Sequence, residues 1–351
     1  MQPYNVKILH LLKSLDLGGI EKSTICYSNC LAEKLSYVAI FSGGGRYTNT
    51  NMISDKVHLC NKIHGTIGLN KYFFPNLFYL ISIIKGGQIN TIFYHYRVYL
   101  PFILTIKILF PRLTIVYVAH SVFNDTRNFC LYANKYIAVS ERVMEDLLKY
   151  RKSDITLIKH GIKVESSVPI QATEIKNIGF IGRFEKSKGI EILLKAFNQL
   201  AFSKKKIGLI FRGEGTEKES IQSFTSLNNL QERVLIEEPI LCEDELYSGI
   251  DILVFPSTSL EGFGMVIPEA MKYGIPVVAS DYMRGSDLID ENNTGIFFKS
   301  GDHIDLASKL KLLIEDNELR RKISNNAIDK VKRSMNLDDT ISKYLEFLYY
   351  L

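Results

Sequence analysis

Two glutamates and a glycine turn carry the clearest chemistry in this sequence. Glu261, Gly262 and Gly264 follow an apolar strand pattern, and Glu269 lies just over one turn into the helix pattern at 265–273. Glycines allow a backbone to approach a ligand closely, and the N–H groups at a helix N-terminus bind phosphate. Carboxylates beside such a site would repel the ligand unless they accept hydrogen bonds from sugar hydroxyls. The pattern favours a ligand with phosphates and sugar rings; the alternative is that Glu269 is an exposed helix residue and the glycines only turn the chain.

A second segment places two basic residues at the end of another predicted strand. Arg183 and Lys188 lie between the strand pattern at 177–181 and the helix pattern at 189–201. Arginine can bind a diphosphate by a forked contact, and lysine can bind it as a point charge. The alternative is a solvated loop, because most basic side chains stay in water.

Three weaker signals lie elsewhere in the chain. Gly18 and Gly19 open a predicted helix without the dinucleotide-binding or P-loop glycine pattern, so a tight turn is the alternative. His120 ends the strand pattern at 114–119 and would point into the expected binding site, although a lone histidine is more often a structural hydrogen-bond partner. Glu214, between two glycines, either lines the pocket or only turns the chain.

Short apolar, β-branched runs alternate with longer helical patterns along the first half of the chain. This alternation is typical of βαβ units, whose strands form a parallel sheet. Ser140 is expected to cap the fourth helix. The predicted strands are 6–12, 37–41, 91–94, 114–119, 136–139 and 155–158, and the predicted helices are 20–34, 70–85, 98–110 and 140–150.

The alternation lapses between 163 and 176 in a polar segment with one proline, which indicates a linker. A second series follows, so the expected fold is α/β with two doubly wound, Rossmann-like domains that face a central cleft at the carboxyl ends of their strands. The expected domains are 1–165 and 166–335, with a helix at 336–351 that packs back on the first domain. The second series has predicted strands at 177–181, 207–212, 233–236, 252–255, 276–279 and 295–298, predicted helices at 189–201, 217–227, 244–249, 265–273 and 304–314, and two further helices within 317–351.

The composition fits a folded protein of about two domains. Of 351 residues, 46% are hydrophobic and 23% are charged, which excludes disordered and collagen-like classes. The net charge of +5 divides into +9 over residues 1–175 and −4 over the rest, so the first half is expected to face an anionic or polar partner. Five cysteines without metal-ligand spacing, and an N-terminus without signal-peptide regions, predict a reduced, cytoplasmic protein. Prolines and basic residues interrupt the apolar stretch at 98–119, which predicts a buried helix and strand rather than a membrane span.

Taken together and in this order, these segments resemble the retaining GT-B glycosyltransferases of family four, the group 1 glycosyltransferases. The resemblance covers nearly the whole chain. It is most specific in the Glu-x7-Glu signature from Glu261 to Glu269 and the following segment 270–280, whereas the N-terminal half is only generically similar. His160 stands where the family commonly has Asn before Gly, a departure expected to alter the local turn and none of the site residues.

The resemblance implies a nucleotide-sugar donor that is held mainly by the second domain. Arg183 and Lys188 would neutralise the donor diphosphate, Glu261 would contact the transferred sugar, and Glu269 would hold the ribose hydroxyls. His120 would lie on the opposite wall of the cleft, and the Gly19 amide would lie near the phosphate. The implied catalytic residues are Glu261, His120, Arg183 and Lys188, and the implied donor-binding residues are Gly19, Gly182, Glu214, Gly262, Phe263, Gly264, Met265, Val266 and Glu269.

The resemblance also implies the reaction. A sugar would pass with retention of configuration from a nucleotide sugar to a glycan or lipid-linked acceptor, as in the synthesis of bacterial capsule or lipopolysaccharide, and UDP is the family's commonest nucleotide. Cationic side chains and a helix dipole would stabilise the leaving diphosphate, so no cofactor and no metal are expected. Asp-x-Asp, the metal-binding signature of the other large glycosyltransferase fold, does not occur in the sequence. The other interpretations are a GT-B nucleotide-sugar epimerase and a non-catalytic nucleotide-sugar-binding protein.

Aromatic and basic residues are mixed at 69–79 and 97–112. Such a mixture can dock on anionic lipid headgroups, so one expectation is peripheral attachment to the inner face of the cell membrane. The other is that the aromatics pack in the core and the lysines are solvated. Nucleic acid is not an expected partner, because the net charge is mild.

Overall fold

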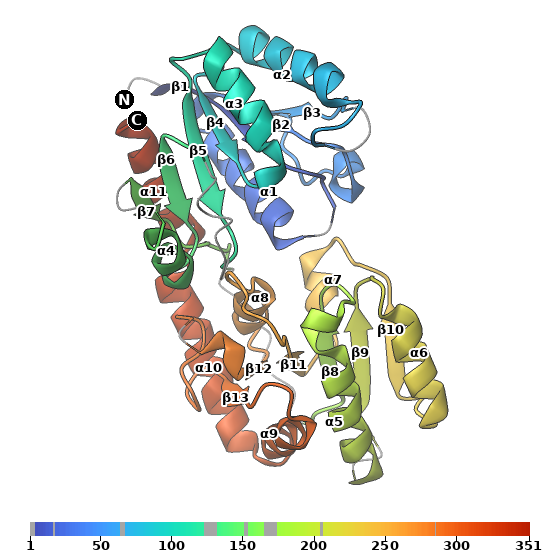
Figure 1. The fold of residues 1–351 in the computed structure, drawn as a ribbon. Helices are drawn as coiled ribbons and strands as arrows, with labels where there is room; N and C mark the ends of the chain where they lie inside the picture. The colour runs from blue at the N-terminus through green and yellow to red at the C-terminus, as the bar shows by residue number, and fades with distance from the viewer. Residues whose placement is uncertain are drawn as a thin grey trace. The chain divides into compact units, whose positions relative to one another are not determined.

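The computed structural model describes residues 4–16, 18–63, 67–122, 132–150, 154–164, 174–203, 206–284 and 286–351. The chain divides into two compact units, shown in Figure 1. Unit 1 comprises Met1–Gly161 and Leu337–Leu351, and unit 2 comprises Ile162–Asn336. The sequence predicts boundaries at 165 and 335, within a few residues of these, and most of the predicted linker at 163–176 lies outside the described residues.

Unit 1 is built on a seven-stranded parallel sheet. Its strands are β1 (Tyr4–Leu11), β2 (Leu35–Phe41), β3 (Val57–Cys60), β4 (Thr91–Tyr94), β5 (Thr114–Ala119), β6 (Lys135–Ala138) and β7 (Ile155–Leu157). They pair in the order β3-β2-β1-β4-β5-β6-β7. The strand order reverses between β1 and β4, and the carboxyl edge of a sheet at such a switch point is where ligands bind in open α/β folds.

The helices of unit 1 connect these strands. They are α1 (Gly19–Ala32), α2 (Phe73–Gly87), α3 (Leu100–Leu109), α4 (Glu141–Leu148) and α11 (Leu337–Tyr349), with 3-10 turns η1 (Arg46–Asn49) and η2 (Arg97–Tyr99). Helix α11 comes from the end of the chain and packs against α1, where the rings of Tyr27 and Tyr344 have centroids 5.5 Å apart. The last helix therefore completes the unit that the first strand begins.

Local sequence signals account for most of these elements. The Ser140 side chain accepts a hydrogen bond from the Val143 N–H at 3.3 Å, which confirms the predicted cap of α4. The segment predicted as one helix at 98–110 contains η2 and then α3, and Pro101 lies in the first turn of α3, where its fixed φ suits a helix start. Strand β3 was not predicted, because it is a four-residue edge strand in which only the first residue is buried.

Unit 2 repeats the arrangement with six parallel strands. They are β8 (Asn177–Ile181), β9 (Gly208–Arg212), β10 (Val234–Glu237), β11 (Ile252–Phe255), β12 (Val277–Ser280) and β13 (Ile296–Phe298), and they pair in the order β10-β9-β8-β11-β12-β13. The helices are α5 (Ile190–Ser203), α6 (Lys218–Leu227), α7 (Glu243–Tyr247), α8 (Val266–Lys272), α9 (His303–Glu315) and α10 (Asn317–Ser334), with 3-10 turns η4 (Lys186–Lys188) and η5 (Asp281–Met283). Here the switch point lies between β8 and β11.

A buried apolar cluster packs against the sheet of unit 2 and supports its switch point. The rings of Phe180, Phe184 and Phe211 contact one another, and helix α5 and helix α9 contribute further apolar side chains to the same cluster.

The two sheets share one strand order, read from the first strand of each unit. The predicted fold class, α/β with two Rossmann-like units, is therefore confirmed.

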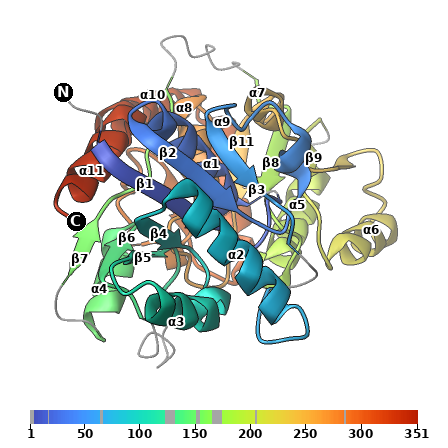
Figure 2. The same cartoon turned by 90° about the horizontal axis from the view of Figure 1, so that it is seen from above.

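Helices α2 and α3 lie side by side in both views of unit 1 (Figures 1 and 2), and the rings of Phe73 and Phe102 join them at 4.6 Å. They leave large apolar side chains in water. We call these six residues the α2–α3 patch: Leu69, Phe74, Phe78, Leu104, Ile108 and Leu109. Among the described residues, no helix combines the length and hydrophobicity needed to cross a bilayer.

Candidate functional site

Two loops leave the sheet at the switch point of unit 2, one after β8 and one after β11. Because β8 and β11 are neighbours, these loops start side by side. The Thr258 N–H donates to the Ser187 carbonyl at 2.8 Å, and the Ser257 Oγ lies 3.1 Å from the same oxygen. The loops therefore form one connected structure, and they carry most of the site residues predicted in the second half of the chain.

Gly189 allows the two loops to meet. Its φ is +69°, in the left-handed region, where it ends the 3-10 turn η4 and precedes α5. A Cβ atom at this position would lie 1.9 Å from the carbonyl oxygen of Pro256, in the loop after β11. Both the backbone angle and the close approach require glycine.

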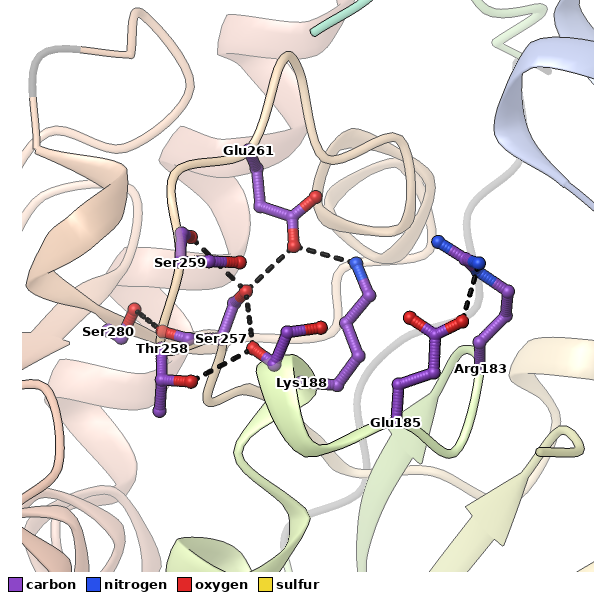
Figure 3. A network of polar contacts seen from close by, with 9 residues as sticks. Arg183, Glu185, Lys188, Ser257, Thr258, Ser259, Glu261 and Ser280 are labelled. Carbon is purple, nitrogen blue, oxygen red and sulfur yellow. Dashed lines mark hydrogen bonds and ion pairs between the residues drawn. The ribbon is translucent and has the colours of Figure 1, made fainter. Parts of the chain in front are cut away.

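Lys188 and Glu261 form an ion pair between the two loops (Figure 3). The Lys188 Nζ lies 2.6 Å from the Glu261 Oε1, and the two side chains are 19% and 18% exposed. The Ser257 hydroxyl lies 2.7 Å from the same carboxylate oxygen, and the Ser280 Oγ donates to the Ser257 carbonyl at 2.6 Å. The carboxylate and the ammonium group are thus held in fixed positions at the carboxyl edge of the sheet.

Arg183 lies on the same loop as Lys188 but has a different partner. Its Nη1 donates to the Glu185 Oε1 at 2.5 Å, and the two side chains are 65% and 37% exposed. Exposed pairs of this kind contribute little to stability, so the guanidinium can exchange this carboxylate for another anion at small cost. Figure 3 shows the pair beside Lys188.

The glycine loop after β9 supports the loop that carries Arg183. The Phe184 N–H donates to the Glu214 carbonyl at 2.6 Å, and the Gly182 N–H donates to the Arg212 carbonyl at 3.0 Å. A Cβ atom on Gly213 would lie 2.0 Å from the Gly182 carbonyl oxygen, so this contact requires glycine. The Glu214 side chain is exposed.

The turn 262–265 leads from the loop after β11 into α8. Gly264 has a φ of +82°, Phe263 is 8% exposed, and Val266 is the first residue of the helix. Met265 precedes α8 and offers no side-chain cap. The left-handed φ of Gly264 turns the backbone directly into α8.

Glu269 is a buried residue of α8, which excludes the alternative that it is an exposed helix residue. It is 3% exposed, and its Oε2 accepts a hydrogen bond from the Tyr247 hydroxyl at 2.7 Å. Burial, followed by the nearby Glu269, raises the pKa of Tyr247 well above its usual value, so this hydroxyl stays a donor. The carboxylate of Glu269 is therefore fixed in orientation.

In unit 1, the start of α1 already holds a carboxylate. Gly19 is the first residue of the helix, and a Cβ on the preceding Gly18 would lie 2.1 Å from the Glu21 Oε2. The Tyr96 hydroxyl donates to the other oxygen of Glu21, which is 6% exposed. The Gly19 amide thus lies next to an acidic side chain, which favours a ligand hydroxyl there over a phosphate.

His120 follows β5, as predicted, and has histidine neighbours that the sequence did not reveal. Its Nε2 lies 2.9 Å from the His95 Nδ1, and its ring stacks on His160 with centroids 5.5 Å apart. Burial and the neighbouring His160 hold the pKa of His120 well below its usual range. The expectation that His160 affects only the local turn is wrong in this respect, because its ring is part of the surroundings of His120.

Sequence reasoning missed Ser257, Tyr247 and His95. Tyr247 and His95 have partners 22 and 25 positions away in the chain, so no local motif marks them. Ser257 lies only four positions before Glu261, but a single serine gives no signal of this contact. The signal that could have found His95 is its place directly after β4, at a switch point. Over the described ranges, no group of three or more His, Cys, Asp or Glu residues is arranged to hold a metal ion.

Comparisons with known proteins find similarity to glycosyltransferases. Residues 166–330 match the family described as Glycosyl transferases group 1, and residues 17–166 match the Glycosyltransferase Family 4. A segment of 173 residues is 29% identical to the capsular polysaccharide biosynthesis glycosyltransferase CapM of Staphylococcus aureus, over 49% of this chain and 45% of that protein. An uncharacterized glycosyltransferase of Haemophilus influenzae is 24% identical over 94% of both chains.

The fold is shared with solved structures at lower identity. The crystal structure of HepE of Anabaena in complex with UDP and glucose has a TM-score of 0.83 and 20% identity, over 99% of this chain and 100% of that chain. The match to CapM spans about half the length of that relative, whereas the match to HepE spans both chains.

Proposed function

We propose that this chain is a group 1 glycosyltransferase that transfers a sugar from a UDP-sugar to a glycan or lipid-linked acceptor with retention of configuration. The two family matches, over residues 166–330 and 17–166, support a glycosyltransferase. The observation that carries the proposal is the fixed pair of Lys188 and Glu261 at the switch point of unit 2. An ammonium group for phosphate and a carboxylate for sugar hydroxyls meet there in one place. A nucleotide sugar has both kinds of group next to each other.

Lys188 and Arg183 bind the donor diphosphate in this proposal. Each has a carboxylate partner, Glu261 and Glu185, at 2.6 and 2.5 Å. A diphosphate offers the two cations equivalent anionic oxygens, and Glu261 then accepts hydrogen bonds from the sugar hydroxyls.

The remaining donor contacts come from backbone and from one buried carboxylate. The amides of 264–266 line the turn into α8 and contribute N–H groups for the phosphates. Glu269, oriented by Tyr247, accepts hydrogen bonds from the ribose hydroxyls. Gly182, Glu214, Gly262 and Phe263 complete the donor contacts of unit 2.

The reaction follows from the charges at the site. The bond between the anomeric carbon and the phosphate oxygen breaks, and its electron pair stays on the departing diphosphate, where Lys188 and Arg183 stabilise the negative charge. The acceptor oxygen bonds to the same face of the anomeric carbon, and its proton passes to the departing phosphate oxygen. Glu261 orients the sugar and does not act as a nucleophile. Cationic side chains replace a metal ion in this scheme.

UDP is proposed as the nucleotide because HepE, which shares the fold, has been solved with UDP and glucose. A bacterial surface polysaccharide is proposed as the product because CapM is named for capsule biosynthesis. The test is incubation with UDP-glucose or UDP-N-acetylglucosamine and lipid-linked oligosaccharide acceptors, with the anomeric configuration of the product read by NMR. Transfer with retained configuration supports the proposal. An epimerised donor without an acceptor product would indicate an epimerase, and tight donor binding without turnover would indicate a binding protein.

The α2–α3 patch is proposed to dock on an anionic membrane that carries the acceptor. Phe78 and Ile108 are 66% and 79% exposed, and Lys71, Lys85 and Arg112 on the same helices and their flanking turns are exposed as well. Exposed apolar side chains with basic neighbours bind the interface of an anionic bilayer. This association would place the protein on the inner face of the cell membrane.

Flotation with phosphatidylglycerol vesicles tests the membrane proposal. Phe78→Asp with Ile108→Asp should abolish flotation, because the two apolar anchors become anionic. Leu227→Asp is the matched control, since Leu227 of unit 2 is 83% exposed and lies outside the patch. Equal flotation of both variants, or wild-type binding that ignores salt and lipid charge, would contradict the proposal.

A further inference from the structure

Four buried or half-buried histidines of unit 1 lie at the carboxyl edge of its sheet. His10 is the next-to-last residue of β1, and His95, His120 and His160 follow β4, β5 and β7. Strands β1, β4 and β5 are adjacent, so the first three histidines lie on neighbouring strands. His10 and His95 are 2% and 6% exposed.

Three of these histidines form a hydrogen-bonded chain. The His10 Nδ1 lies 3.0 Å from the His95 Nε2, and the His95 Nδ1 lies 2.9 Å from the His120 Nε2. Each of the two end rings has one further nitrogen, His10 Nε2 and His120 Nδ1. Both are buried, and neither has a hydrogen-bond partner among the described residues.

The hydrogen bonds couple the tautomers of the three histidines, so the tautomer of one ring determines those of the other two. A neutral imidazole has one N–H donor and one bare acceptor nitrogen. At each contact, one nitrogen must donate and the other must accept, because two bare nitrogens or two N–H groups facing each other would repel. Since every contact joins an Nδ1 to an Nε2, the three rings are either all Nε2–H or all Nδ1–H.

Burial keeps all three rings neutral near pH 7. It lowers the pKa of His10 to about 3. The pKa of His95 and that of His120 also lie well below their usual range, in both cases mainly because of burial. Among the described residues, His160 stacks on His120, the Tyr27 hydroxyl of α1 contacts His160, and the Tyr344 ring of α11 contacts Tyr27. Burial lowers the pKa of His160 to about 4 and raises the pKa of both tyrosines, so these groups are neutral as well.

We propose that His95 and His10 are positioning residues for His120: they hold its ring by Nε2 and leave Nδ1 as the nitrogen that meets a ligand hydroxyl. A hydroxyl can donate or accept, and the coupled chain lets Nδ1 match either role when all three tautomers change together. The identity of the ligand as a sugar rests on the proposed function. The coupling of the three rings does not.

Histidine-labelled protein tests the coupling without any substrate. Long-range ¹H–¹⁵N spectra at pH 7 report which nitrogen of each imidazole carries the proton. We expect His10, His95 and His120 to be neutral and to share one tautomer. Different tautomers on neighbouring rings, or a charged ring among the three, would overturn the proposal.

Variants of His10 test whether the chain acts over a distance. His10 is two hydrogen bonds away from His120, so His10→Phe should change the ¹⁵N shifts of His120, and His10→Asn, whose amide can donate or accept near the Nδ1 position, should restore them. His58→Phe is the matched control, because His58 is an exposed histidine of β3, at the edge of the same sheet. Unchanged His120 shifts in His10→Phe would contradict the coupling.

Kinetic measurements test whether the three hydrogen-bonded histidines affect turnover. His95→Phe should lower kcat/KM by about tenfold or more, as the loss of an outer partner that orients a functional histidine does in metal sites. In a protein that already carries His120→Phe, the additional change His95→Phe should lower kcat/KM little further, since His95 acts through His120. His95→Asn keeps an amide near Nδ1 and should retain most of the activity. If His95→Phe lowered kcat/KM equally in the wild-type and the His120→Phe proteins, the positioning role would be overturned. A wild-type protein without transferase activity would instead overturn the proposed function, and the spectroscopic test of the coupling would remain valid.

Discussion

The two units share one strand order but carry opposite chemistry at their switch points. In unit 1 the carboxyl edge carries buried, neutral histidines that bond to one another. In unit 2 the same edge carries partly exposed ion pairs on glycine-rich loops, Lys188 with Glu261 and Arg183 with Glu185. The comparison teaches that the doubly wound sheet decides where a site forms, and that the residues directly after the strands decide what the site can bind.

The difference has an electrostatic reason. An exposed ion pair such as Arg183 with Glu185 can exchange one anionic partner for another at small cost, which suits a ligand that arrives with its own negative charge. Buried imidazoles avoid charge altogether, because burial penalises the charged form. The edge in unit 2 is therefore suited to an anion, and the edge in unit 1 to neutral hydroxyls.

The largest expected effect comes from removing a cation in unit 2. Lys188→Ala should lower donor turnover by about 10²–10³-fold, because the departing diphosphate loses a fixed positive charge, and Arg183→Ala should also lower turnover by orders of magnitude. Steady-state kinetics with a UDP-sugar measure both, and a circular dichroism spectrum checks the fold.

Lys186→Ala is the matched control for this prediction, since Lys186 is an exposed lysine of the same 3-10 turn η4. Its turnover should stay near the wild-type value. Near-wild-type transfer in both Lys188→Ala and Arg183→Ala would break the assignment of the anionic ligand to unit 2.

A second prediction concerns the backbone that brings the two loops of unit 2 together. Gly189→Ala should lower the free energy of unfolding by about 2–4 kcal/mol, because its methyl group would meet the Pro256 carbonyl oxygen at a position that also needs a left-handed φ. Urea unfolding followed by hydrogen exchange, peptide by peptide, measures the change and shows which unit loses stability.

Gly249 offers a control with the same backbone demand and no close neighbour. Its φ is +72°, and a Cβ there would have nothing within 4 Å. Gly249→Ala should therefore cost only about 1 kcal/mol. If the two variants were equally destabilised, the close contact between the loops would carry no energetic weight.

A third prediction sharpens the comparison through acid stability. Burial lowers the pKa of His10 to about 3 and that of His160 to about 4, whereas the pKa of a histidine in the unfolded chain is about 6.5. Between pH 7 and 5 the unfolded state binds protons that the folded state does not, so the stability of unit 1 should fall as the pH falls, by at most about 1.4 kcal/mol per pH unit for each such histidine. Above about pH 7.5 this contribution is complete and flat.

Hydrogen exchange at pH 7, 6 and 5 tests this acid sensitivity unit by unit. Unit 2 contains only His303, so histidine protonation should change its peptides little in this range. His10→Phe should reduce the slope in unit 1, and His58→Phe should not, since His58 is exposed. Equal acid sensitivity in both units would show that the buried histidines do not set it.

The smallest expected effect is that of a chelator. EDTA should leave transferase activity unchanged within error, because in the proposed reaction Lys188 and Arg183 supply the positive charge that a metal ion supplies elsewhere. Activity assays with and without EDTA and added Mg²⁺ or Mn²⁺ measure this. A loss restored by one of these metals would refute the scheme of cationic side chains alone.

Local patterns predicted the elements of the fold closely where burial is complete. The strands at 91–94, 114–119, 177–181 and 252–255 match β4, β5, β8 and β11 residue for residue, since each is a short apolar run. The edge strand β3 was missed because its side chains are mostly outside the core and leave no clear periodicity. The cap residue Ser140 was readable because its effect is confined to a few neighbouring residues, whereas Gly189, predicted as the first residue of a helix, instead ends the turn before α5.

The candidate site was predicted as a set of residues but not as a set of contacts. Lys188 and Glu261 were both named from the sequence, yet their pairing across 73 positions was not foreseeable, and neither was the support from Ser257. The roles of these residues toward a ligand stay predictions until the kinetics are measured. His10 and His95 were not named at all, because a single histidine gives no signal of its partner.

The sequence alone determined the alternation of strands and helices, the glycines that turn the chain and the types of residue after each strand. These depend on the period of apolar side chains and on backbone angles, which are properties of a few consecutive residues. Only the tertiary structure decided that β1 lies beside β4 and β8 beside β11, because strand pairing joins segments far apart in the chain. That pairing converts separate histidines into a coupled chain in one unit, and separate charges into a fixed ion pair in the other.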